Sequence, residues 1–180
     1  MKKLMIASHI AMAMAASSAM ATVQQGSQGE VQFVGTVAAK TCDVIVSGDG
    51  AVNNQIQFGV VNVGGNKKKE FTIKLKDPTC IATPARAASS TAKFIWYSPA
   101  LSEKGFKNQS GTATNAYVVL NAKDGADNTP TNSDVITDLN NAVDFNISLP
   151  EKGFVYEATL HAGDIPGSFG TAASYTIAYE

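Results

Sequence analysis

The sequence predicts an all-β domain built as a two-layer sandwich. Short runs of alternating apolar and polar residues recur along the chain, and clusters of Gly, Asn, Asp and Pro separate them. This combination is typical of β-strands joined by turns. Two runs, EFTIKLK at 70–76 and AVDFNISL at 142–149, place their apolar side chains on one face only. Strands have this pattern when two sheets pack face to face.

The first 21 residues have the features of a secretory signal peptide. Lys2 and Lys3 precede an apolar stretch at 4–16, and Ala19-Met20-Ala21 forms a small-x-small cleavage site. We expect cleavage after Ala21, export of the chain, and no other segment that spans a bilayer. The alternative is an N-terminal core helix.

The charge balance argues against a protein that binds nucleic acid. Cleavage removes two of the 14 basic residues and none of the 15 acids, so the mature formal charge is 12 − 15 = −3. The basic run at 67–69 is predicted to lie in a solvated, Gly-rich turn. A phosphate or sulfate site is the alternative for this run.

The two cysteines, Cys42 and Cys80, predict one structural disulfide, since an exported chain meets an oxidising compartment. The bond would close a loop of about 38 residues and contribute about 4 kcal/mol. A metal site is the weaker alternative, because His161 is the one histidine of the mature chain.

The predicted strands follow one another with turns between them. The strands cover residues 30–39, 41–46, 55–58, 70–76, 92–97, 117–121, 143–149, 155–161 and 173–179. Turns are predicted at 47–50, 63–66, 105–112 and 123–134. Trp96 is expected to anchor the core, with a ligand-stacking platform as the alternative.

Both ends of the mature chain carry a strand with an apolar face. After a polar stretch at 22–28, five apolar or small residues stand at strict two-residue spacing: Val31, Phe33, Gly35, Val37 and Ala39. The last strand alternates in the same way, with Tyr175, Ile177 and Tyr179 on one face. Two interpretations stay open: the terminal strands complete one sandwich, or they pair between chains.

Nothing in the sequence predicts an enzyme. GxSxG, HExxH, P-loop and GxGxxG motifs are absent from the sequence, and Asp124, Asp127 and Asn128 lack the spacing of a calcium loop. We expect no catalytic residues, no metal and no cofactor.

Several segments resemble one family in their joint order and spacing. These are GEVQFVGTVAAKTC at 29–42, the second cysteine after LKDPT, Gly167 at fourteenth from the end, and the penultimate Tyr179. Together they resemble pilins of the chaperone–usher pathway. The stretch from 92 to 121 is similar to the major subunits of enterotoxigenic-type fimbriae.

The resemblance implies an incomplete immunoglobulin-like β-sandwich that lacks its seventh strand. Its parts would be a removed signal peptide (1–21), an N-terminal donor-strand extension (22–40) and a pilin domain (41–180). The extension would enter the apolar groove of the next subunit, the mode called donor-strand complementation. Gly35 would lie where the backbones approach closely, and the apolar donor residues would fill pockets: Val31, Phe33, Val37 and Ala39.

The resemblance also implies partners and a location. A periplasmic chaperone and an outer-membrane usher would deliver the subunit to a surface fimbrium (a pilus) that supports cell adhesion. The chaperone would contact Gly167 and the strand of Tyr175, Ile177 and Tyr179, and its basic residues would hold the carboxylate of Glu180. Contacts to a host glycan receptor would lie in the loops 105–115 and 123–134. The alternatives are a secreted, monomeric β-sandwich that binds glycans and, less favoured, a periplasmic hydrolase.

Overall fold

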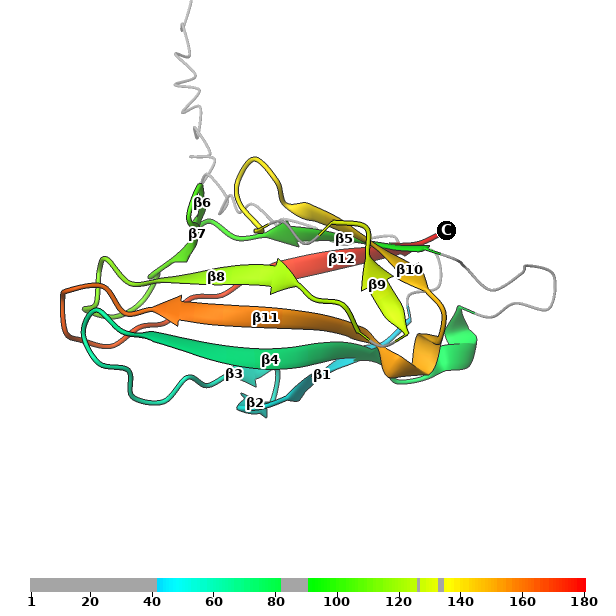
Figure 1. Cartoon of the computed structure of the whole chain (residues 1–180), viewed down its shortest axis with the longest axis horizontal. Helices are drawn as coiled ribbons and strands as arrows, with labels where there is room; N and C mark the ends of the chain where they lie inside the picture. Colours follow the sequence, from blue (N-terminus) through cyan, green and yellow to red (C-terminus); the bar gives the residue numbers. More distant parts are fainter. Residues whose placement is uncertain (1–41, 82–90, 126, 133–134) are drawn as a thin grey trace, which may run out of the picture. The chain divides into compact units, whose positions relative to one another are not determined.

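The computed structural model describes residues 42–81, 91–125, 127–132 and 135–180. In this part of the chain, antiparallel strands form a six-stranded sheet, a four-stranded sheet and a short hairpin (Figure 1). The larger sheet has the order β1 (Val44–Gly48), β4 (Asn66–Leu75), β11 (Phe154–His161), β8 (Tyr117–Ala122), β7 (Gly105–Lys107) and β6 (Leu101–Ser102). The smaller sheet has the order β12 (Ser174–Tyr179), β5 (Thr91–Tyr97), β10 (Ala142–Ile147) and β9 (Asn128–Pro130). The hairpin joins β2 (Ala51–Val52) to β3 (Gln55–Ile56), and two short 3-10 helices are η1 (Pro78–Cys80) and η2 (Pro150–Lys152).

The predicted all-β fold is confirmed, with corrections to individual elements. Strands β9 and β7 lie inside stretches predicted as turns, 123–134 and 105–112. Each of these strands has only three residues, too few to show an alternation of apolar and polar positions. The basic run at 67–69 was wrongly placed in a turn, because it forms the start of β4. Two of these lysines form ion pairs, Lys68 with Glu157 at 3.0 Å and Lys69 with Asp49 at 2.6 Å.

The core lies between the two sheets and follows from the alternation of the strands. In β4 the buried side chains are Phe71, Ile73 and Leu75, and in β5 they are Ala92, Phe94 and Trp96. Aromatic rings join the sheets: Phe94 packs on Phe154 with centroids 4.9 Å apart. Offset and edge-on ring contacts of this kind add to the gain from burial. The two sheets therefore share one hydrophobic core.

Trp96 is a core anchor, as expected. Its side chain is 5 % exposed and packs edge-on against Tyr156, with ring centroids 5.3 Å apart. The indole Nε1 donates a hydrogen bond to the Tyr156 hydroxyl at 3.4 Å. The buried polar groups of both rings thereby have a partner. This burial rules out the alternative of an exposed ligand-stacking platform.

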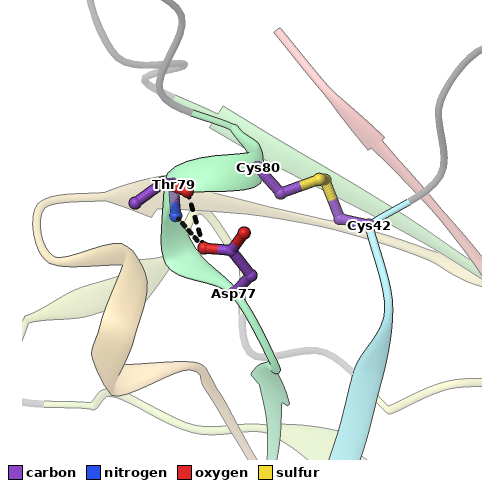
Figure 2. Close-up of a disulfide and its surroundings, with 4 residues drawn as sticks. All are labelled: Cys42, Asp77, Thr79 and Cys80. Carbon is purple, nitrogen blue, oxygen red and sulfur yellow. Dashed lines mark hydrogen bonds between the residues drawn. A yellow bond between two sulfur atoms is a disulfide. The ribbon is translucent and has the colours of Figure 1, made fainter.

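The predicted disulfide between Cys42 and Cys80 is confirmed (Figure 2). The two Cα atoms are 5.8 Å apart, within the range that disulfides span. Helix η1 is capped by Asp77, whose carboxylate accepts hydrogen bonds from the backbone N–H and the hydroxyl of Thr79. The disulfide joins the residues just before β1 to the segment that follows β4.

The strand registers define two ends of this sandwich. Val44 at the start of β1 pairs with Leu75 at the end of β4, and Phe154 at the start of β11 pairs with Ile73. Phe154 also packs on Phe94 of β5. The first residues of β5 pair with the last residues of β12. One end of the domain therefore holds Cys42 and the end of β12. The opposite end holds the start of β12, the start of β4 and the end of β11 (Figure 1).

Asn128 is a buried polar residue whose hydrogen bonds are fully satisfied. Its side-chain amide donates to the carbonyls of Leu149 (3.0 Å) and Gly153 (2.7 Å). Its oxygen accepts from the backbone N–H groups of Ser148 (3.0 Å) and Leu149 (3.2 Å). The side chain thus joins β9 to the connection between β10 and β11.

We predict that Asn128→Asp lowers the free energy of unfolding by about 2–4 kcal/mol at pH 7, since the substitution removes both donors and buries a charge. Chemical denaturation of the oxidised mature chain measures the loss. The matched control is Asn146→Asp on the exposed face of β10, with an expected change within about 0.5 kcal/mol. Equal losses in the two variants would contradict the assigned role.

Candidate functional site: an open groove beside β12

Strand β12 is hydrogen-bonded along one of its two edges. The backbone of Glu180 exchanges two hydrogen bonds with Thr91, at 3.0 and 3.1 Å. Because hydrogen-bonded pairs alternate in an antiparallel ladder, Thr176 and Ala178 also face β5 with their backbone groups. The N–H and C=O groups of Tyr175, Ile177 and Tyr179 point the other way. No strand in the described part of the chain pairs with that outer edge.

The inward side chains of β12 cover the core incompletely. Tyr175, Ile177 and Tyr179 pack against the core cluster but remain half-buried, and the residues between them are exposed. The ring of Tyr175 lies 5.0 Å from that of Trp96. On the neighbouring β5, by contrast, the inward side chains are fully buried. The core is therefore partly open to solvent along β12.

A groove of about 890 Å³ opens into the core at the end of the domain where β12 begins. Its floor is the inner face of the larger sheet, formed by buried apolar side chains: Phe71, Val118, Leu120, Ala158 and Leu160. One wall is the segment 54–63, which contributes Phe58 and Val61. The other wall is the segment 165–173, which leads directly into β12. The groove is thus an apolar opening between these two segments.

Hydrogen bonds hold the 165–173 wall in place. The amide of Asn108 donates to the carbonyl of Ala113 (3.0 Å), and its oxygen accepts from the backbone N–H of Gly170 (3.0 Å). The side-chain oxygen of Gln109 accepts from the N–H of Ala172 at 3.0 Å. The backbones of the two segments also bond directly, from the N–H of Ala113 to the carbonyl of Ser168 (3.0 Å). Residues of the loop after β7 therefore hydrogen-bond with polar groups of the wall, and the wall's apolar side chains line the groove.

Gly167 is required by close packing. A Cβ atom at this position would collide with the hydroxyl of Thr112 and the backbone N–H of Ala113. The packing is equally close at Gly111 of the loop, where a Cβ atom would collide with the carbonyl of Ser168 on the wall. Only glycine lets the wall and the loop approach this closely.

Two buried hydroxyls, one on the groove wall and one near the far end of β12, have no hydrogen-bond partner. They belong to Thr171 and Tyr179, and one carboxylate oxygen of Asp144 is the third such atom among the described residues. Burial, followed by the charge of Tyr175, raises the pKa of Tyr179 to about 12. Burial also raises the pKa of Tyr175. Orphaned buried hydroxyls are uncommon and call for a structural explanation.

The predicted site residues fall into three groups. The proposed donor residues Val31, Phe33, Gly35, Val37 and Ala39 lie outside the described residues. Gly167 lines the groove, whereas Tyr175, Ile177 and Tyr179 lie on the strand that continues from its wall. The backbone of Glu180 is engaged with Thr91.

Sequence patterns missed much of the groove. The wall at 54–63 and the supporting residues Asn108 and Gln109 were not predicted as parts of a site. The sequence feature that could have indicated the groove walls is their lack of charged residues. Residues 53–66 and 165–179 contain no Asp, Glu, Lys or Arg, in a chain with 16 % charged residues.

Other chemistry is sparse in the described part of the chain. His161 stacks on Tyr117 with ring centroids 4.7 Å apart. Within residues 42–81, 91–125, 127–132 and 135–180, no three His, Cys, Asp or Glu side chains gather as metal ligands do. In the same ranges, no helix has the length and apolar character needed to cross a membrane. The groove is the structural feature that stands out for binding.

The raised tyrosine pKa values predict a loss of stability at alkaline pH. A tyrosine in an unfolded chain ionises near pH 10. The folded state holds the phenol protons more tightly, so the tyrosines leave the free energy of unfolding unchanged below about pH 10. That free energy falls as pH rises from about 10 to 12. Tyr179→Phe should flatten the fall in denaturation curves recorded across this range; an unchanged slope would contradict the assignment.

Comparison with known proteins identifies relatives of the whole chain. No protein-family model matches. The chain is 36 % identical over 181 residues to the F107 fimbrial protein of Escherichia coli, and the alignment covers 100 % of both chains. Among solved structures, it is similar to the P pilus rod subunit PapA, with 18 % identity, a TM-score of 0.46, and coverage of 85 % of this chain and 100 % of that one. It is also similar to a chaperone–usher pilus structure, with 21 % identity, a TM-score of 0.47, and coverage of 88 % and 99 %.

The 36 % identity to the F107 fimbrial protein over the full length of both chains identifies the family of this chain. The protein is a structural subunit of a fimbria rather than an enzyme, as expected from its sequence. It therefore forms filaments with other such subunits at the cell surface. The chain belongs to the fimbrial protein family, as its resemblance to fimbrial subunits implied.

Proposed function

We propose that this fimbrial subunit polymerises by donor-strand complementation. In this mechanism the groove beside β12 takes up residues 30–40 of a neighbouring copy. The observation that carries the proposal is the unpaired outer edge of β12 next to an open, apolar groove. A strand added to such an edge gains main-chain hydrogen bonds, and its alternate side chains enter pockets.

The donor segment has the composition that the groove requires. Residues 30–40, EVQFVGTVAAK, place an apolar or small residue at every second position. Burial of Val31, Phe33 and Val37 would contribute about 5–8 kcal/mol. Ladder hydrogen bonds to the free edge of β12 would add about 1 kcal/mol each. In this arrangement Ala39 would occupy a pocket position and Gly35 would lie where the two backbones approach most closely.

Pairing between chains fits a fimbrial subunit better than pairing within one chain. A donor that fills its own groove would give a closed monomer. A donor that fills the next groove makes a head-to-tail contact that does not close, and a filament follows. No observation in the described residues favours the alternative of a monomeric glycan-binding module.

The remaining parts of the proposal concern export and adhesion. Residues 1–21 act as a signal peptide, 22–40 as the extension and 41–180 as the pilin domain. A periplasmic chaperone would occupy the groove before assembly, with Gly167 and the β12 residues Tyr175, Ile177 and Tyr179 as contacts. It would hold the carboxylate of Glu180, and an outer-membrane usher would export the subunit. The assembled fimbria would support adhesion, with a host glycan as a candidate receptor.

Hydrogen exchange tests the proposed strand addition at single residues. The acceptor is the full mature chain with Gly35→Leu, which keeps its groove but has an inactive donor. The added probe is a peptide of residues 30–40. The amide hydrogens of Tyr175, Ile177 and Tyr179 should exchange at least about tenfold more slowly, as expected for about 1.4 kcal/mol of added protection. Those of Thr176 and Ala178, already bonded to β5, should change little.

The matched control is the same peptide with Gly35→Leu. The leucine side chain would clash where the strands lie closest, so we expect no protection from this peptide. Equal protection by both peptides would contradict the role of Gly35. Unchanged exchange at all three outer-edge amides with the unmodified peptide would contradict donor-strand complementation itself.

A further inference from the structure

Three apolar side chains project into solvent at the mouth of the groove. Val60 is 93 % exposed, Val63 is 54 % exposed and Ile165 is 42 % exposed. All three line the same opening, Val60 and Val63 from one wall and Ile165 from the other. We call these three residues the apolar rim. Exposed apolar residues that cluster in this way mark interaction surfaces more often than residues scattered singly.

The fold holds the rim in an outward position. The N–H of Gly64 donates to the carbonyl of Gly163 at 2.5 Å, and the N–H of Ala162 donates to the carbonyl of Gly65 at 3.0 Å. These bonds join the two walls at the end of the groove. Val61 packs against the core cluster, whereas its neighbour Val60 does not. The rim therefore stands outside the core as a fixed surface.

The segments that carry the rim have the composition of an interface core. Residues 53–66 and 165–179 contain no charged side chain, although 16 % of the chain is charged. The buried centres of protein–protein interfaces are depleted in charge in the same way. A partner that covers the rim would thus bury apolar surface without having to desolvate a charge.

The length of chain after the donor segment points to the partner. Only Thr41 separates Lys40, the last donor residue, from Cys42, where the disulfide-linked domain begins. Two residues span at most about 7 Å. The neighbouring domain must therefore begin directly beside the point where its donor leaves the groove.

The direction of the donor decides which end of the acceptor is contacted. Every pairing in the four-stranded sheet is antiparallel, and antiparallel pairing is slightly the more stable kind. A donor antiparallel to β12 leaves the groove at the end where β12 begins. The apolar rim lies at this end.

We propose that the apolar rim is the docking surface for the Cys42 end of a second copy of this chain. The rim then forms a contact between domain bodies, separate from the donor strand itself. The inference rests on the proposed donor-strand mechanism, and it adds a second contact to each joint. At the Cys42 end of the domain, Leu149 is 38 % exposed and offers an apolar counterpart.

The test compares a donor peptide with a whole donor subunit. Acceptors are full mature chains with Gly35→Leu, either otherwise unmodified or carrying Val60→Asp or Ile165→Asp. The first ligand is a labelled peptide of residues 30–40. The second is the full wild-type mature chain whose own groove is filled with that peptide. Leu139→Asp is the matched control, since Leu139 is also 93 % exposed but lies outside the groove lining.

Because Val60 and Ile165 also stand on the groove walls, each variant is judged by the rise in the donor subunit's Kd relative to any rise in the peptide's Kd. Relative to the peptide, the Kd of the donor subunit should rise about tenfold or more with Val60→Asp or Ile165→Asp, the loss expected when one buried apolar contact is removed. Leu139→Asp should leave both constants unchanged. Fluorescence of Trp96 checks that each acceptor is folded.

Two other outcomes overturn the inference while leaving donor-strand complementation standing. If peptide and donor subunit weaken equally, the rim belongs to the groove and does not contact a second domain. If neither weakens, the rim is not covered in the joint. If the peptide fails to bind the folded, unmodified acceptor, the proposed function fails and the inference fails with it.

Discussion

Strand β12 has hydrogen-bond partners on one side only, and most of the candidate site follows from this one constraint. Its inner edge is paired with β5, which fixes the strand and turns Tyr175, Ile177 and Tyr179 toward the core. Its outer edge presents unpaired backbone groups within the described residues, next to apolar side chains that a further strand would cover. Exposed edges of this kind usually invite aggregation. In the proposed donor-strand mechanism the same property would serve ordered assembly, because a defined segment of the next chain would pair with the edge.

The groove stays open because the surrounding elements are tied elsewhere. The 165–173 wall has its polar groups bonded to Asn108, Gln109 and neighbouring residues of the loop after β7. The close fit of Gly167 against Thr112 and Ala113 packs that wall on the same loop. At the other end of the domain, the disulfide from Cys42 to Cys80 ties the residues just before β1 to the segment that follows β4. In the proposed mechanism, a donor strand would therefore connect two rigid parts.

Sequence patterns predicted the parts of this structure that have a strong period. The alternation in EFTIKLK and SYTIAY identified β4 and β12, and the even cysteine count identified the disulfide. Short strands such as β7 and β9 were missed because three residues cannot show an alternation. The wall at 54–63 was missed for a different reason. Its role depends on lying opposite 165–173, about a hundred residues later, and no local pattern reports such a contact.

Isotope-coded cross-linking distinguishes a strand that reaches β12 from a neighbouring chain from one that belongs to the same chain. Filaments are assembled from equal parts of ¹⁴N- and ¹⁵N-labelled chains in which a photo-reactive phenylalanine analogue replaces Phe33. Cross-linked peptides that join position 33 to β12 or to the groove walls are then identified by mass. Donor-strand complementation predicts that about half of these cross-links join a light chain to a heavy chain, as random head-to-tail pairing requires. Cross-links found only within chains of one isotope would show that each chain fills its own groove, and would contradict donor-strand complementation.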